Sequence, residues 1–152
     1  MTGRCIALIM LTATRCKEAR EATWDEIDLP KKLWIIPAHR TKGGTEHRVP
    51  LSKPAVELLK VLALYRSPTN PLIFPGRAPS HNAPSNGTLL RVMDRLGCPE
   101  VTNHGFRTTF RTWVTENGKP WEVGEASLSH KLGSKVALAY MRSDLLDLRR
   151  FH

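Results

Sequence analysis

Cysteine, tyrosine and long apolar runs are all scarce in this sequence of 152 residues, and each scarcity excludes a class of protein. The three cysteines, Cys5, Cys16 and Cys98, are an odd number without metal-ligand spacing, so they indicate reduced thiols in a cytoplasmic protein. The longest strongly apolar run, Cys5–Leu11, is far shorter than the roughly 20 residues of a membrane-spanning helix. Nor does any charged segment precede an apolar segment and a cleavage site, as a secretion signal would require.

Acidic residues are also in short supply. Fourteen Asp and Glu face 23 Lys and Arg, which leaves a formal charge of +9. Such a surplus favours a polyanionic partner, with nucleic acid first and an anionic membrane surface second. We find no basic amphipathic helix with a bulky apolar face, and this disfavours the membrane surface. The length and the 41% hydrophobic content predict a single domain with its own core and no internal repeats.

Apolar periodicity and turn residues predict an α+β domain, mostly helical with a small antiparallel sheet of three strands. Strands are expected at 33–36 and 47–51, joined through Gly43-Gly44, with a third at 24–29. Helices are expected over residues 1–23, 53–66, 88–96, 103–116 and 121–129, and after Ser134. Residues 67–87 hold five of the eleven prolines and predict an irregular connection.

The segment NHGFRTTFRTWV, residues 103–114, carries two different helical faces. Three aromatic residues fall at i, i+4 and i+7 on the face that we expect to be buried: Phe106, Phe110 and Trp113. Three basic residues lie on another face: His104, Arg107 and Arg111. His104 lies in the first helical turn, where unpaired N–H groups favour an anion. The pattern fits a phosphate clamp, and a solvated basic face is the alternative.

Two further patterns suggest anion binding without deciding it. Arg15 follows an apolar run, and Glu18 three residues later could orient its guanidinium toward a phosphate. An ordinary surface ion pair explains the same spacing. Lys42 stands beside the Gly43-Gly44 turn, on a tip able to deliver a proton or a point charge, although lysines at exposed turns are common.

Four segments, taken in order, resemble the signature boxes of the tyrosine recombinases, and most closely those of bacteriophage and prophage integrases. These segments are TATRCKEAREATWDEID, RTKGGTEHRVPLS, HGFRTTFR and SLSHKLGSKVALAYMRSDLL. Residues 12–18 follow the family pattern Thr-Gly-x-Arg-x-x-Glu, except that Ala13 replaces the glycine. His130 closes a small-Leu-small-His phrase, and Tyr140 follows ten residues later, as the family's nucleophile does.

The resemblance implies that DNA is cleaved and rejoined without a metal or any other cofactor. Tyr140 would attack a backbone phosphate, forming a 3′-phosphotyrosyl bond and releasing a 5′-hydroxyl. The implied catalytic residues are Arg15, Lys42, His104, Arg107, His130 and Tyr140, with Glu18 in support of Arg15. Three more arginines are candidates for contacts to DNA phosphates: Arg40, Arg48 and Arg111.

Each group would have a distinct part in this chemistry. The two arginines, Arg15 and Arg107, would hold the non-bridging phosphate oxygens. His104 would accept the tyrosine proton or donate to a phosphate oxygen, and His130 would supply a further hydrogen bond. Lys42 would protonate the departing 5′ oxygen.

By the same resemblance, residues 1–152 form the catalytic domain, without the N-terminal core-binding and arm-binding domains of the family. The expected partner is double-stranded DNA of the attachment-site type, bound by a tetramer of the full-length protein, with this chain alone a monomer. The expected role is integration or excision of a prophage or mobile element. Two alternatives stay open: a type IB topoisomerase-like nicking and closing enzyme, and a non-catalytic DNA-binding remnant of a prophage integrase.

Overall fold

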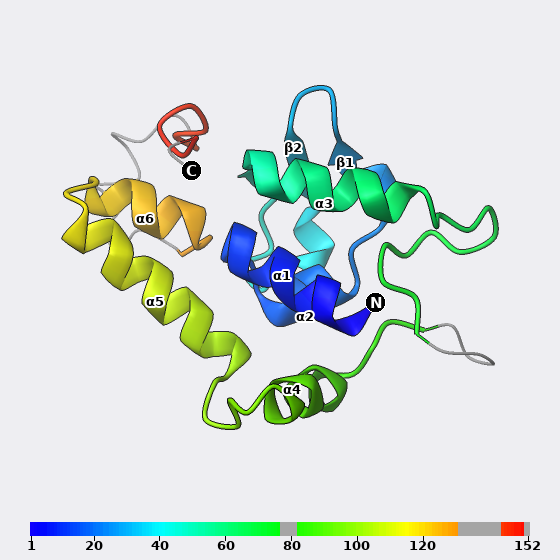
Figure 1. The fold of residues 1–152 in the computed structure, drawn as a ribbon. Helices are drawn as coiled ribbons and strands as arrows, with labels where there is room; N and C mark the ends of the chain where they lie inside the picture. The colour runs from blue at the N-terminus through cyan, green and yellow to red at the C-terminus, as the bar shows by residue number, and fades with distance from the viewer. Residues whose placement is uncertain (77–81, 131–143, 151–152) are drawn as a thin grey trace.

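A computed structural model of the protein describes residues 1–76, 82–130 and 144–150. In it, helices pack against a small antiparallel sheet, and a helical pair projects to one side (Figure 1). The elements before the proline-rich connection are α1 (Thr2–Thr12), α2 (Cys16–Arg20), η1 (Trp24–Glu26), β1 (Ile27–Asp28), β2 (Leu33–Ile36), η2 (Ala38–Arg40), β3 (His47–Pro50) and α3 (Lys53–Ala63). Those after it are α4 (Asn86–Arg95), α5 (Asn103–Glu116) and α6 (Trp121–Ser127). None of the described helices is both long and apolar enough to cross a membrane.

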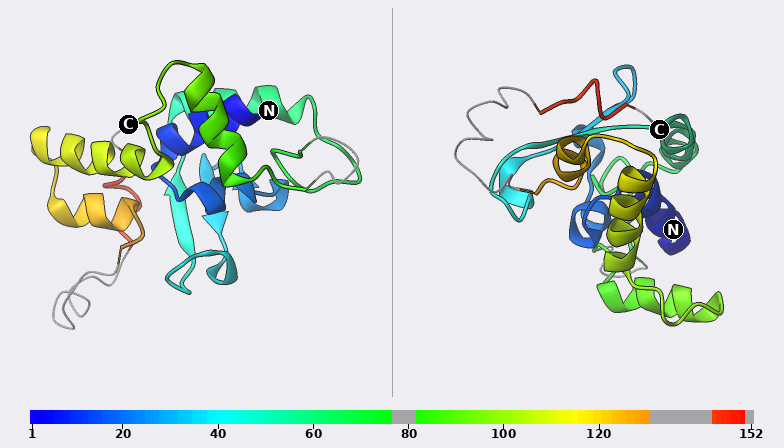
Figure 2. Two further views of the ribbon diagram at one scale, coloured as in Figure 1. Left: turned by 90° about the horizontal axis from the view of Figure 1, so that it is seen from below. Right: turned by 90° about the vertical axis from the view of Figure 1, so that its left-hand side faces the viewer.

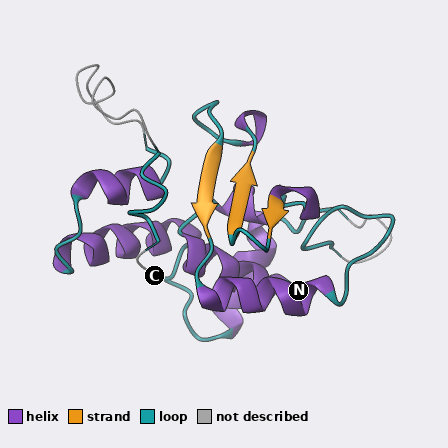
Figure 3. Cartoon of the chain, turned by 90° about the horizontal axis from the view of Figure 1, so that it is seen from above, coloured by secondary structure: helices purple, strands orange, loops and turns teal. Residues whose placement is uncertain are grey.

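The sheet has the order β1-β2-β3 and is antiparallel throughout, as expected (Figure 3). Trp34 lies opposite Ile27 on one side and Val49 on the other. The strand predicted over residues 24–29 is shorter in the structure. Its observed counterpart, β1, covers only Ile27–Asp28, because residues 24–26 form a 3-10 turn. That turn buries the Glu26 side chain, whose carboxylate accepts a hydrogen bond from Trp34 Nε1 at 2.9 Å. In an extended strand, successive side chains point to opposite faces of the sheet. The 3-10 turn at residues 24–26 instead directs the Glu26 carboxylate toward Trp34.

The first predicted helix is interrupted, so the expectation of one helix over residues 1–23 was wrong. Ala13 takes a left-handed conformation with φ of 50°, which ends α1. The chain then passes through Thr14 to Arg15, an extended residue that precedes α2. Glycine adopts this left-handed conformation at lower cost than alanine, so Ala13 is the less favourable residue at this turn. The interruption places Arg15 at a helix start instead of mid-helix.

Helix caps explain most of the remaining boundaries. Ser52 accepts a hydrogen bond from Ala55 N at 3.4 Å and begins α3, which ends three residues before the predicted position 66. Ser85 caps α4 in the same way, so this helix begins at residue 86, earlier than expected. The bounds of α5 match the prediction, with Thr102 as its cap. The helix expected after Ser134 lies outside the described residues.

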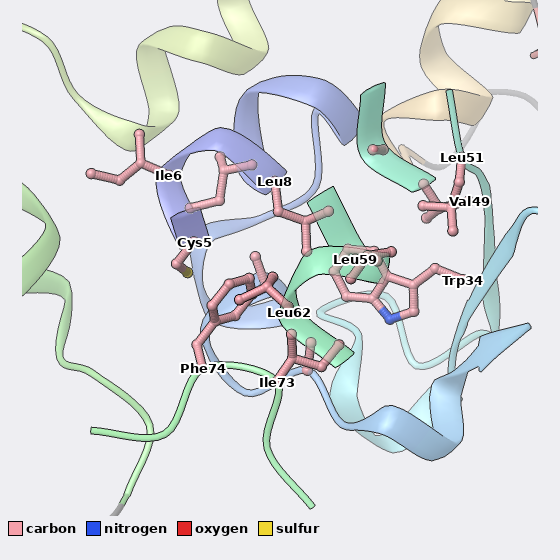
Figure 4. Packing of buried hydrophobic residues seen from close by; sticks show 14 of the residues in the cluster. Cys5, Ile6, Leu8, Trp34, Val49, Leu51, Leu59, Leu62, Ile73 and Phe74 are labelled. Atoms are coloured by element: carbon pink, nitrogen blue, oxygen red, sulfur yellow. The ribbon is translucent and has the colours of Figure 1, made fainter. Parts of the chain in front are cut away.

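The hydrophobic core lies between the sheet and helices α1 and α3 (Figure 4). Trp34 is its largest fully buried side chain. Around it the core is built from α1, α3 and the connection that follows α3, including Cys5, Leu8, Ile9, Leu59, Leu62, Ile73 and Phe74. Helix α1 also contacts α4 and α5, so the core anchors the start of α5.

The aromatic stripe of α5 is not its buried face. Phe106 and Phe110 are partly buried, and Trp113 is 37% exposed. Among the α5 residues whose burial is described, Arg107 and Val114 are buried, two turns apart on one side. The prediction was wrong because α6 lies beside α5 and covers this other side (Figure 2).

Close packing of α5 on α6 depends on Gly124. A Cβ atom at this position would meet Val114 Cγ1 at 2.9 Å, and the branched valine has little freedom to move. We therefore expect Gly124→Val to lower the free energy of unfolding by about 1–3 kcal/mol through overpacking. Urea unfolding measures this change. The control is Gly87→Val in α4, where a Cβ would meet nothing closer than 3.8 Å. Equal effects of the two substitutions would contradict the role of Gly124.

Candidate active site

A cleft of about 780 Å³ brings together five of the six predicted catalytic residues. They come from four parts of the chain and line the cleft together: Arg15, Lys42, His104, Arg107 and His130. Tyr140, the sixth, lies outside the described residues and remains a prediction. The catalytic residues predicted from separate sequence boxes therefore lie together in one cleft, as far as the structure describes them.

Arg15 is held in place by Glu18. Its backbone N–H donates to Glu18 Oε2 at 2.7 Å, and its NH1 donates to Glu18 Oε1 at 3.1 Å. Glu18 is only 2% exposed, so this contact is not the surface ion pair that the spacing alone allowed. Arg15 NH2 also donates to the carbonyl of Ser129 at 3.3 Å, which ties α2 to the segment after α6. The prediction that Glu18 orients Arg15 is consistent with this geometry.

Arg107 lies deepest in the cleft and is 6% exposed. Its NH1 donates to the carbonyl of Ala13, and its NH2 donates to the carbonyl of Leu128 at 2.6 Å. Burial, reinforced by the neighbouring charge of Arg15, lowers the pKa of Arg107 to about 10. The group stays cationic at neutral pH, in a position where an anion would be stabilised. A solvated basic face is thus excluded for Arg107.

His130 has a defined partner for each ring nitrogen. Nε2 lies 3.2 Å from Arg107 NH2, and Nδ1 lies 2.9 Å from Glu125 Oε2. Because a guanidinium only donates, Nε2 accepts, and the ring proton is on Nδ1, facing Glu125. The residue before it, Ser129, has a left-handed φ of 51°, which turns the chain back after α6.

His104 and Lys42 are exposed and form the rim of the cleft. His104 lies in the first turn of α5, directly after the Thr102 cap. Lys42 follows Thr41, whose buried hydroxyl lies 3.0 Å from the carbonyl oxygen of Ala38 and 2.8 Å from that of Thr45, and donates its one proton between them. The backbone next to Lys42 is therefore anchored, while its side chain faces solvent.

Besides the start of α2, the N-termini of α4 and α5 border the cleft, and sequence analysis missed that of α4. Asn86, at the start of α4, lines it together with Thr102 and His104 from the start of α5. The positive end of each helix dipole favours an anion there. The Ser85 cap was the available signal for α4, but proline-rich sequence before it obscured the helix start.

The three arginines proposed for DNA contacts differ in their surroundings. Arg40 is 13% exposed, and its NH1 contacts both carboxylate oxygens of Glu26, at 2.6 and 2.9 Å. Its guanidinium is thus paired with Glu26 inside the protein and does not face solvent as a DNA contact would require. Arg48 lies 3.3 Å from Asp144, and Arg111 lies 3.0 Å from Glu125. These two side chains are 42% and 54% exposed and remain candidates for phosphate contacts.

His47, which sequence analysis did not select, is buried beneath the arginines. It is 5% exposed, and burial together with the charges of Arg149, Arg107 and Arg15 lowers its pKa to about 3. The imidazole is therefore neutral in the folded protein at neutral pH. A neutral side chain at this point keeps a further positive charge away from Arg15 and Arg107.

We expect the depressed pKa of His47 to make stability fall in acid. Between its ordinary pKa of about 6.5 and about 3, the unfolded chain binds a proton that the folded protein excludes. Stability from this group is complete above about pH 6.5 and is lost by about 1.4 kcal/mol per pH unit below it. Urea unfolding across this range should show a shallower slope for His47→Gln than for wild type. The same change at exposed His39 should leave the slope unaltered.

Comparison with known proteins shows to which family this chain belongs. Residues 1–145 match the sequence profile of the phage integrase family. The chain belongs to this family. It is 39% identical over 152 residues to the prophage integrase IntA of Escherichia coli (strain K12), covering 99% of this chain and 37% of that protein. It is 38% identical over 168 residues to the integrase of Enterobacteria phage P4, covering 99% and 38%. This integrase-family chain therefore spans less than two fifths of either relative.

Solved structures confirm the fold of this integrase-family chain. The integrase from mycobacterium phage Brujita superposes with a TM-score of 0.70 at 23% identity, over 98% of this chain and 48% of that one. The XerA recombinase gives a TM-score of 0.66 at 20% identity, over 92% and 61%. Within the part of the chain that the structure describes, no three His, Cys, Asp or Glu side chains gather as a possible metal site.

Proposed function

We propose that this chain is the catalytic part of a site-specific DNA recombinase that uses Tyr140 as its nucleophile. The observation that carries the proposal is the convergence of two arginines, two histidines and a lysine on one cleft. The arginines, Arg15 and Arg107, supply planar donor groups suited to the two non-bridging oxygens of a phosphodiester. Charge grows on those oxygens as phosphorus is attacked, and fixed donors stabilise it.

The proton transfers follow from the positions of the other residues. The Tyr140 hydroxyl has an ordinary pKa near 10, so it must lose its proton as it attacks phosphorus. His104 accepts this proton from the rim of the cleft. The bond between phosphorus and the 5′ oxygen breaks, and Lys42 protonates that oxygen. The phosphotyrosyl bond retains the energy of the phosphodiester, and attack by a second 5′-hydroxyl reverses the step.

The proposed substrate is double-stranded DNA of the attachment-site type. Three features support it: the net charge of +9, the two integrase relatives, and structural similarity to the XerH recombinase bound to its difH substrate, with a TM-score of 0.68. We further propose integration or excision of a mobile element as the role, and a tetramer on DNA as the assembly of the full-length protein.

Covalent trapping tests this proposal. The protein is incubated in EDTA with a nicked duplex carrying its attachment site, and adducts are separated by denaturing electrophoresis. Wild type should give a slower-migrating protein–DNA band, and Tyr140→Phe should give none. The matched control is Tyr65→Phe, which removes the hydroxyl from an exposed tyrosine after α3 and should leave the band intact.

Other outcomes would support a different function. A band that persists in Tyr140→Phe would assign the nucleophile to another residue. Salt-sensitive DNA binding without any band would favour the non-catalytic remnant. Relaxation of supercoiled DNA without exchange of strands between two sites would favour the topoisomerase-like activity.

A further inference from the structure

We infer that Glu125 is a positioning residue for His130, holding the imidazole with its proton on Nδ1 and with Nε2 directed at the phosphate position. The inference rests on the proposed function for its catalytic consequence, whereas the arrangement itself is a property of the free protein. None of the sequence boxes pointed to Glu125.

Glu125 contacts the same histidine twice. Its Oε2 lies 2.9 Å from His130 Nδ1, and its backbone carbonyl accepts from His130 N at 3.0 Å. The left-handed Ser129 makes both contacts possible, because it folds residue 130 back over the last turn of α6. A separation of five residues would not bring two side chains together on a continuous helix.

The carboxylate is buried, and cations flank it. Glu125 is 6% exposed, and its second oxygen, Oε1, lies 3.0 Å from Arg111 Nε on α5. On the other side of the imidazole, Arg107 NH2 lies 3.2 Å from Nε2. Arg15 reaches the same turn through the carbonyl of Ser129. A continuous row of polar contacts thus runs from the exposed Arg111 through Glu125 and His130 to the base of the cleft.

This arrangement has a consequence for phosphate binding. In the free protein Nε2 accepts from Arg107, so the ring is neutral with its only proton on Nδ1. A phosphate oxygen that takes over the Arg107 donor frees the Nε2 lone pair. With the Glu125 carboxylate behind the ring, the partly exposed imidazole can then take a proton from solvent at Nε2 and donate it as a hydrogen bond to the phosphate. Arg111 and Glu125 therefore belong to the site although neither lines the cleft.

The alternative is that Glu125 only joins α5 to α6 as a structural ion pair with Arg111. Ring nitrogen signals in ¹⁵N NMR spectra of the free protein distinguish the two. Wild type should show His130 with its proton on Nδ1, assigned by loss of the signal in His130→Gln. Glu125→Ala should abolish this single tautomer, because the ring loses the acceptor that keeps Nδ1 toward α6 and Nε2 facing Arg107. The matched control, Glu122→Ala, changes an exposed carboxylate on the same helix and should preserve it.

Covalent trapping adds the catalytic readout. Glu125→Gln keeps the size of the side chain and an oxygen that accepts from Nδ1, so the tautomer should persist. Its neutral amide no longer stabilises a protonated ring, and formation of the adduct should slow by about 10–100-fold, as for other residues that orient a functional histidine. Retention of the Nδ1 tautomer in Glu125→Ala, or wild-type cleavage by Glu125→Gln, would overturn the inference. If no protein forms an adduct, the proposed function fails, and the NMR result still decides the positioning role.

Discussion

Replacing Arg107 with lysine should slow the cleavage of DNA by about 10²–10³-fold, the usual effect of losing one fixed donor to a developing negative charge. The expectation follows from the position of the guanidinium. Its NH1 and NH2 are anchored to the carbonyls of Ala13 and Leu128, and this fixes the guanidinium in the wall of the cleft. A single ammonium group cannot hold both carbonyls and a phosphate in the same geometry.

Charge adds to the geometric loss. Burial beside Arg15 already lowers the pKa of Arg107 to about 10. A lysine starts from an ordinary pKa about two units below that of arginine, so the same surroundings bring its pKa closer to neutral pH. A larger fraction of the variant would then meet the phosphate without its positive charge. Raising the pH should therefore impair the lysine variant more than wild type.

The measurement is the rate of covalent adduct formation, taken well below the unfolding temperature of each variant. Arg66→Lys is the control, because Arg66 is exposed, lies over the Trp24 ring and does not line the cleft. A lysine variant at position 107 that cleaves within threefold of wild type would show that this arginine serves only the fold. Thermal unfolding of the same samples separates that structural contribution from the catalytic one.

The second large effect concerns stability. Replacing Arg40 with alanine should lower the free energy of unfolding by about 3–5 kcal/mol, because it leaves the buried Glu26 carboxylate without its counter-ion. Arg40 NH2 also donates to the carbonyl of Glu18 at 2.6 Å, and this joins the segment before Lys42 to the helix that holds Arg15. The substitution should therefore loosen the relative placement of Lys42 and Arg15 as well.

The pH dependence of this effect has a defined sign. Burial raises the pKa of Glu26 despite the hydrogen bond from Trp34 and the charge of Arg40. A carboxyl whose folded pKa is raised contributes stability that is complete below its unfolded pKa, near 4.5, and is lost as pH rises from there through the folded pKa. Without Arg40 the carboxyl should stay protonated to higher pH. The destabilisation should hence be smaller at about pH 4.5 than at about pH 7.5.

Urea unfolding at the two pH values measures both parts of this prediction. Lys60→Ala is the matched control, since Lys60 pairs with Glu57 on α3 and both side chains are 58% exposed. Such surface pairs contribute about 0–1 kcal/mol. If the two substitutions had equal effects, the buried pair would not be a principal support of the fold.

Several features of this protein followed from short-range sequence patterns. The strands around Trp34 and Val49 pair antiparallel as expected, and Ser52 and Thr102 begin helices because their side chains accept hydrogen bonds from the following turn. The order of the sequence boxes predicted which residues would meet in the cleft. Tyr140 lies outside the described residues and stays a prediction from sequence alone.

Other features depend on contacts between distant segments, and no local pattern encoded them. Arg40 and Arg48 are both basic residues near the same hairpin, yet packing buries the first against Glu26 and leaves the second exposed. Likewise, α6 covers the side of α5 that carries Arg107, and this reversed the expected burial of the aromatic stripe.

The surroundings of His130 show the same division between sequence and structure. The types and the order of the predicted catalytic residues could be predicted from the sequence, because they lie within short motifs. The partnership of Glu125 with His130 requires a left-handed residue at position 129, and the partnership of Arg107 with Ala13 spans more than ninety residues. Local propensities act over one or two turns of chain, whereas burial and the need to pair buried polar groups act across the whole core. The sequence thus determined the elements and the chemical groups, and the tertiary structure decided which of those groups face one another.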